Sequence, residues 1–163
     1  MHEALVQAGK EYFNQRETYH KAFSCIKDFS DESSRKFAFE ALQTHVRSKF
    51  RGISSKLTKK MGCQLTCVPE NYTEAVEIEH AVPLNLIHDH ILGIKGKGVG
   101  FKSATDYILK ESEDIQAYVA IFVVGVWVTK VQHSKLNARS MHQEFDMTAN
   151  LDAWNVNELS LKN

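Results

Sequence analysis

The chain has 163 residues, and its 20 Lys and Arg side chains balance its 20 Asp and Glu side chains. Apolar residues make up 43% of it and charged residues 25%, which is ordinary for a globular protein and excludes collagen-like, fibrous and wholly disordered classes. The length fits a single domain, residues 1–163, that buries its own core.

Several features of the composition bear on the compartment. The longest apolar run, residues 117–128, is shorter than the about 20 residues that a membrane span requires. Residues 1–4 lack a basic region, and no apolar segment of a signal peptide follows them. The three cysteines are an odd number, which is unsuited to a disulfide framework. We therefore expect a cytoplasmic protein without membrane contact.

The first part of the chain, residues 1–68, is predicted to be mainly helical. Apolar residues recur at helical spacing over residues 3–28 and more regularly over residues 32–61. Residues 30–34 separate the two segments and offer N-caps for the second helix. Gly52 lies inside the second helix and is a position where it could bend.

The next part, residues 69–141, is predicted to mix strands and helices, and residues 142–163 form a weakly patterned tail. Residues 63–68 and 75–82 are β-prone, and Pro83 ends the second of these runs. Helices are expected over residues 83–94 and 103–119, and an apolar strand over residues 121–128. Thr129 and Gln132 form the pattern of a capping box, which predicts a short helix from there to about residue 138.

The balanced charge hides an uneven distribution. Residues 35–60 carry eight basic side chains against the single acidic Glu40, a net charge of +7. Residues 70–79 carry four Glu and no basic residue, a net charge of −4. The basic helix and a Gly- and Lys-rich loop after residue 92 favour binding to the phosphates of a nucleic acid, although both also read as ordinary solvated surface. The basic side chains expected to contact it are Arg47, Arg51, Lys56, Lys59, Lys95, Lys97 and Lys102.

Two short segments carry the strongest functional signal. The first is EHAVP, which begins with Glu79 and His80 at the end of a strand. The second is VWVTKVQHSKLN, an apolar strand, a capped turn, and a helix with His133 and Asn137 four residues apart on one face. Both segments resemble the HNH, or ββα-metal, endonuclease family, in the small form found in phages and mobile elements. The two halves are here separated by about 45 residues, and no flanking Cys pairs for a structural zinc are present.

The resemblance implies a role for four residues of these segments. His80 is expected to be the general base and Glu79 a ligand of one divalent ion, Mg²⁺ or Mn²⁺, with His133 or Asn137 as the ligand from the helix. A neutral imidazole can take a proton from water near pH 7, and a hard cation stabilises charge on the phosphate. His88-Asp89-His90 is an alternative ligand cluster, but neighbouring helical residues do not share a face.

The resulting expectation is an α+β fold in which the long N-terminal helices pack beside a ββα-metal-like element, interrupted by a helical insertion over residues 84–120. The expected function is hydrolysis of phosphodiester bonds in DNA, and the resemblance also allows a homodimer that cuts both strands. Two alternatives stay open: a noncatalytic nucleic-acid-binding protein on a degenerate nuclease fold, and a phage or host factor that binds a protein. Without the resemblance, the sequence predicts only an α+β domain with a basic face.

Overall fold

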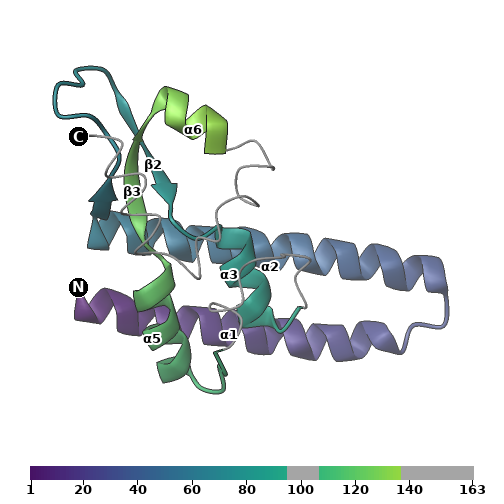
Figure 1. Cartoon of the computed structure of the whole chain (residues 1–163). Coiled ribbons are helices and arrows are strands. Elements are labelled where there is room, and N and C mark those ends of the chain that lie inside the picture. The colour runs from purple at the N-terminus through teal and green to yellow at the C-terminus, as the bar shows by residue number, and fades with distance from the viewer. Residues whose placement is uncertain (95–106, 137–163) are drawn as a thin grey trace.

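The computed structural model of the chain describes residues 1–94 and 107–136. Over these residues the chain has the expected α+β class. A long helical hairpin carries two shorter helices, and a small sheet with a further helix stands above them (Figure 1). Among the helices of these two ranges, none has both the length and the apolar composition needed to cross a bilayer.

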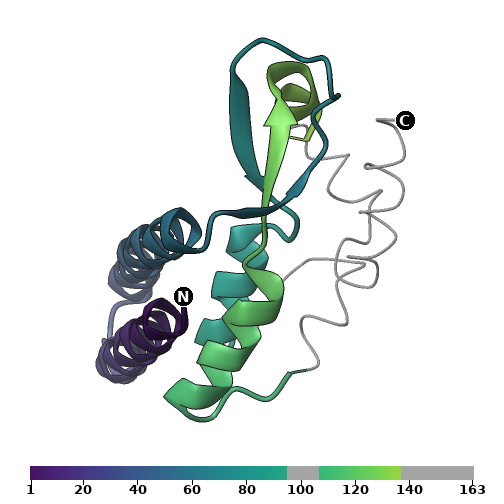
Figure 2. The same cartoon turned by 90° about the vertical axis from the view of Figure 1, so that its left-hand side faces the viewer.

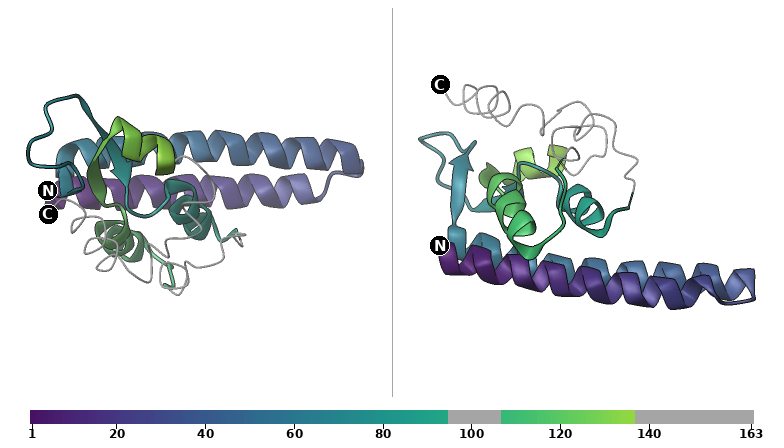
Figure 3. Two further views of the ribbon diagram at one scale, coloured as in Figure 1. Left: turned by 45° about the horizontal axis from the view of Figure 1, so that its top comes forward. Right: turned by 90° about the horizontal axis from the view of Figure 1, so that it is seen from below.

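The hairpin consists of α1 (His2–Lys27) and α2 (Glu32–Met61), close to the predicted bounds. Asp31 caps α2 by accepting a hydrogen bond from the Ser34 backbone N–H at 2.9 Å. Gly52 does not interrupt α2, and Gly62 follows its end with a φ of 72°. The turn end of the hairpin extends beyond the other elements (Figure 3). The predicted apolar stripes meet between the helices, where the buried members include Tyr12, Tyr19, Val46, Phe50 and Leu57.

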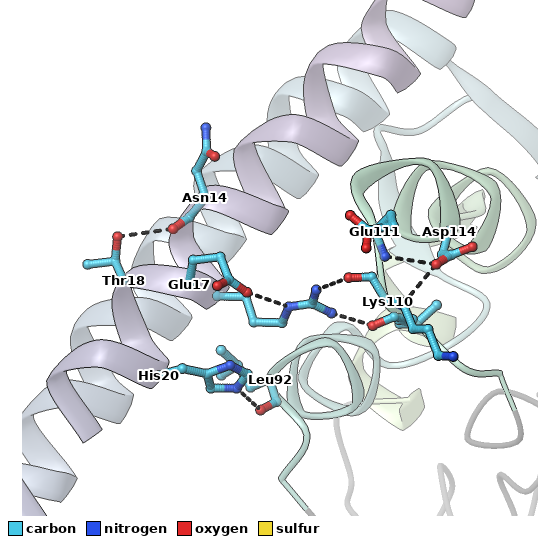
Figure 4. Close-up of polar contacts among 10 residues, drawn as sticks. Asn14, Glu17, Thr18, His20, Leu92, Lys110, Glu111 and Asp114 are labelled. Atoms are coloured by element: carbon cyan, nitrogen blue, oxygen red, sulfur yellow. Dashed lines mark hydrogen bonds and ion pairs between the residues drawn. The ribbon is translucent and has the colours of Figure 1, made fainter. Parts of the chain in front are cut away.

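Two helices between β2 and β3 in the sequence lie on the hairpin. Helix α3 (Leu84–Leu92) contacts both α1 and α2, and α5 (Ser112–Phe122) crosses α1. The buried Arg16 of α1 fastens the segment before α5, because its guanidinium donates to the carbonyl oxygens of Leu109 and Lys110 at 2.6 Å each. Figure 4 shows these contacts around Lys110. The Nε2 atom of His20 lies 3.1 Å from the carbonyl oxygen of Leu92, so α1 contacts the end of α3 as well as the segment before α5.

The sheet has the strand order β1-β3-β2. Strand β1 (Cys63–Thr66) runs parallel to β3 (Gly125–Thr129), and β2 (Val76–His80) runs antiparallel to it. The short helix α6 (Lys130–Leu136) follows β3 directly and contacts β2 and β3. Figure 2 shows this unit standing above α3 and α5, with the hairpin to one side. The capping box predicted for α6 is present, since Thr129 and Gln132 exchange side-chain to backbone hydrogen bonds at 2.8 and 3.2 Å.

Two predicted elements were placed wrongly. Residues 107–110, expected in a helix over 103–119, are not helical, and α5 begins only at Ser112. The Asp114 carboxylate accepts from the backbone N–H groups of Lys110 and Glu111, which fixes the helix start after Glu111. The strand expected over 121–128 is Gly125–Thr129, because the apolar residues up to Phe122 continue the buried stripe of α5. Residues 103–106 lie outside the described ranges.

Candidate functional site

Strand β2 presents two different sets of side chains. Successive strand residues point to opposite faces of a sheet, so Glu77 and Glu79 share one face and Ile78 and His80 share the other. The register pairs Glu79 with Val126, while His80 pairs with Gly125. The face with the two glutamates is the one that α6 covers, because His133 of α6 contacts both of them.

The structure brings Glu79 and His133 together, as their predicted shared role requires. The Nδ1 atom of His133 lies 2.5 Å from Glu79 Oε1, and its Nε2 atom lies 3.3 Å from Glu77 Oε2. The imidazole thus lies between two carboxylates, one at each ring nitrogen. Glu79 is the most enclosed of the three, with 16% of its side chain exposed against 33% for His133 and 37% for Glu77.

His80 lies on the opposite face of β2 and contacts the hairpin instead of α6. Its Nε2 atom is 3.0 Å from the hydroxyl of Thr58, a buried residue near the end of α2. Burial lowers the pKa of His80 below its ordinary value, because the charged imidazolium loses hydration there. His80 is therefore held neutral near pH 7, with one ring nitrogen bound to the hairpin.

The alternative cluster His88-Asp89-His90 does not converge. His88 is buried and its Nε2 atom lies 2.8 Å from the Ser54 hydroxyl. Asp89 binds Arg47 of α2, and His90 Nε2 lies 2.7 Å from the carbonyl oxygen of Tyr107. The three side chains have three separate partners, as expected for neighbours on a helix.

The predicted basic residues that the structure describes all lie on α2, but they do not form one surface. Arg47 is engaged with Asp89 through two hydrogen bonds of 2.9 and 3.0 Å. Lys56 lines a shallow groove between α1 and α2, while Arg51 lies near His88. Lys59 is exposed. The loop residues Lys95, Lys97 and Lys102, and the predicted ligand Asn137, lie outside the described residues.

Glu77 is the residue of this cluster that the sequence analysis missed. The signal was available, because Glu77 lies two residues before Glu79 in a strand and therefore on the same face. Within residues 1–94 and 107–136, no three His, Cys, Asp or Glu side chains are already arranged around a common metal position. The cluster is in this structure a set of direct contacts between one imidazole and two carboxylates.

No protein-family model matches the chain, and no curated protein or solved structure gives a match. The function is therefore inferred from the geometry of these residues.

Proposed function

We propose that the protein is a metal-dependent DNA endonuclease of the ββα-metal type, with β2, β3 and α6 as its catalytic element. The observation that carries this proposal is the contact of His133 with Glu79, two residues that lie about 50 positions apart and that the resemblance paired as ligands. The order of strand, antiparallel strand and helix around that contact supports it as well.

Glu79 and His133 would hold a divalent cation through a carboxylate oxygen and an imidazole nitrogen, a donor set that suits Mn²⁺. The two atoms now contact each other directly at 2.5 Å, so the cation would have to replace this contact. Glu77 would then accept from the Nε2–H of His133, the outer carboxylate that orients a ligating imidazole. The ion would supply charge neutralisation at the phosphate and at the leaving oxygen.

His80 has the properties expected of the general base. Burial lowers its pKa and keeps it neutral at physiological pH, where a base must hold no proton. If Nε2–H donates to the Thr58 hydroxyl, Nδ1 is the nitrogen that can accept a proton from water. Glu79 and His80 lie on opposite faces of the edge strand β2, so the proposal requires a phosphate at the free edge of β2 that both side chains reach.

Cleavage of a supercoiled plasmid tests the proposal. The wild-type chain is expected to nick it with Mg²⁺ or Mn²⁺ and to stop when EDTA is added. His80→Ala is expected to lower the rate by at least about 100-fold, since general-base catalysis contributes about 10²–10⁴-fold. The matched control is His45→Ala, because His45 is exposed on α2, away from the sheet. A wild-type chain inactive with both ions, or a fully active His80→Ala, contradicts the proposal.

Binding of Mn²⁺, measured by titration calorimetry, tests the ligands separately from activity. Glu79→Gln and His133→Ala are expected to abolish binding. Glu77→Gln is expected to weaken it by about 10- to 100-fold, the usual effect of losing an outer-shell carboxylate. Glu70→Gln, on the exposed β1–β2 connection, serves as the control and should bind as the wild type does.

The direct contacts of His133 with both carboxylates also favour a second candidate, a nucleic-acid-binding protein without a metal. In that case the imidazole fastens α6 to β2 and no cation enters. DNA retention without Mn²⁺ binding and without nicking would identify this second function.

A further inference from the structure

The face of the sheet opposite α6 is open and apolar. It carries Val76 and Ile78 from β2 and Trp127 from β3, and the register pairs Ile78 directly with Trp127. These side chains are 39%, 42% and 37% exposed, whereas Val126 and Val128 on the other face are buried. Together these three neighbouring residues form a contiguous, partly exposed apolar patch, the kind of surface feature that marks a binding site when it is large enough.

The same face continues into basic residues of the hairpin. His80 lies next along β2 from Ile78 on this face, and Thr58 of α2 contacts it. Arg51 precedes Thr58 by seven residues, about two turns of α2, so the two residues share a helix face and Arg51 lies on the side of α2 that contacts His80. Arg47 is already paired with Asp89, but Arg51 is exposed. The acidic side chains of β2 point to the other face.

We infer that this open face binds an unpaired stretch of nucleic acid, with a base stacked on Trp127 and a backbone phosphate at Arg51. The inference rests on the proposed function and specifies its substrate as single-stranded or locally unpaired. Base–aromatic stacking needs a base whose face is free, and a duplex covers both faces of its bases. The strand would then pass over His80, between the aromatic ring and the arginine.

A second copy of the chain fits this face less well. A stable protein interface buries about 800 Å² on each partner, far more than three partly exposed side chains provide. Two copies joined through this face would also bring their positively charged Arg51 side chains towards one another. Charge complementarity therefore favours a polyanion over a second copy.

Fluorescence anisotropy with the full chain tests the inference. The probes are a labelled 12-nucleotide DNA strand and the same strand annealed to its complement, both in EDTA so that neither metal binding nor cleavage contributes. The wild type is expected to prefer the single strand. Trp127→Leu, which keeps an apolar side chain but removes the ring, is expected to weaken that binding by about 5- to 150-fold, whereas Trp127→Phe keeps most of it. Phe37→Leu on the hairpin, 74% exposed, is the control and should not change it.

Arg51→Gln tests the phosphate contact. It is expected to weaken binding of the single strand and to lower the slope of log affinity against log salt by about one.

Several outcomes overturn the inference. They are an equal loss of binding in Trp127→Leu and Trp127→Phe, no loss in either variant, and equal affinity of the wild type for the single strand and the duplex. A change of sedimentation coefficient in Trp127→Leu alone also overturns it, since it would identify a second copy as the occupant. A chain that binds as expected but never nicks DNA refutes the proposed function and leaves the stacking site standing.

Discussion

Ser54 binds two buried polar groups at once. Its hydroxyl contacts the Tyr12 hydroxyl of α1 and lies 2.8 Å from His88 Nε2 of α3. All three side chains are at most 1% exposed, so water cannot replace a lost partner. Because each buried polar group left without a hydrogen bond costs about 1–3 kcal/mol, Ser54→Ala is expected to lower the free energy of unfolding by about 2–4 kcal/mol. Urea denaturation measures it, and Ser55→Ala, the exposed neighbour, should stay within about 0.5 kcal/mol of the wild type.

The contacts of the candidate-site residues differ in how well the sequence predicts them. The pairing of Glu79 with His133 was predicted from a motif whose halves lie far apart, and the structure places them in contact. The partner of His80 was not predictable, because Thr58 belongs to α2 and no local spacing relates the two residues. Glu77 could have been found from strand alternation alone. Contacts within one element follow from periodicity, whereas contacts between elements need the tertiary fold.

The crossing of α1 and α5 depends on Gly9. A Cβ atom at this position would lie 2.7 Å from the carbonyl oxygen of Ser112 and 2.9 Å from the Cβ atom of Gln116, closer than van der Waals contact. Gly9→Ala is therefore expected to force the helices apart and to lower the free energy of unfolding by about 1–3 kcal/mol, as overpacking does. Gly52 is the matched glycine of α2, with no atom within 4 Å of a Cβ there.

Gly52→Ala is expected to change stability in the opposite direction. Glycine in a helix interior is less favourable than alanine by about 0.5–1 kcal/mol, and nothing around Gly52 opposes the added methyl group. Thermal unfolding of both variants compares them directly. If Gly9→Ala and Gly52→Ala shift the midpoint temperature of unfolding in the same direction, the close packing of α1 against α5 does not explain the effect of Gly9→Ala.

At the scale of the whole molecule, the helical hairpin was the part that the sequence predicted best. Its two apolar stripes are long and regular, and both helices end within about a residue of their predicted limits. The region between β2 and β3 was predicted less well, because a short apolar run fits a buried helix and a strand equally. The parallel pairing of β1 with β3 had no local signal, since these strands lie about 60 residues apart. The pairing of β1 with β3 therefore could not be predicted from local sequence patterns.

Stability is expected to fall as the pH falls below about 6.5, and His88 is a main cause. Burial lowers its pKa to about 3, with further lowering by the positive charges of Arg51, His80 and Arg47. Between pH 6.5 and about 3 the unfolded chain binds a proton at this histidine and the folded chain does not, so protonation favours unfolding. The loss from one such group approaches about 1.4 kcal/mol for each pH unit. Burial of His80 acts in the same direction.

Urea denaturation at pH 7.5, 6 and 5 measures this dependence against two glutamine variants. His88→Gln removes the titrating group but keeps a side chain that can hydrogen bond to Ser54, so its free energy of unfolding should fall less steeply with decreasing pH than that of the wild type. His45→Gln removes an exposed histidine and should run parallel to the wild type. If the free energies of unfolding of the wild type and His88→Gln fall equally with decreasing pH, His88 takes up no proton on unfolding. That result would contradict the prediction made from its buried position.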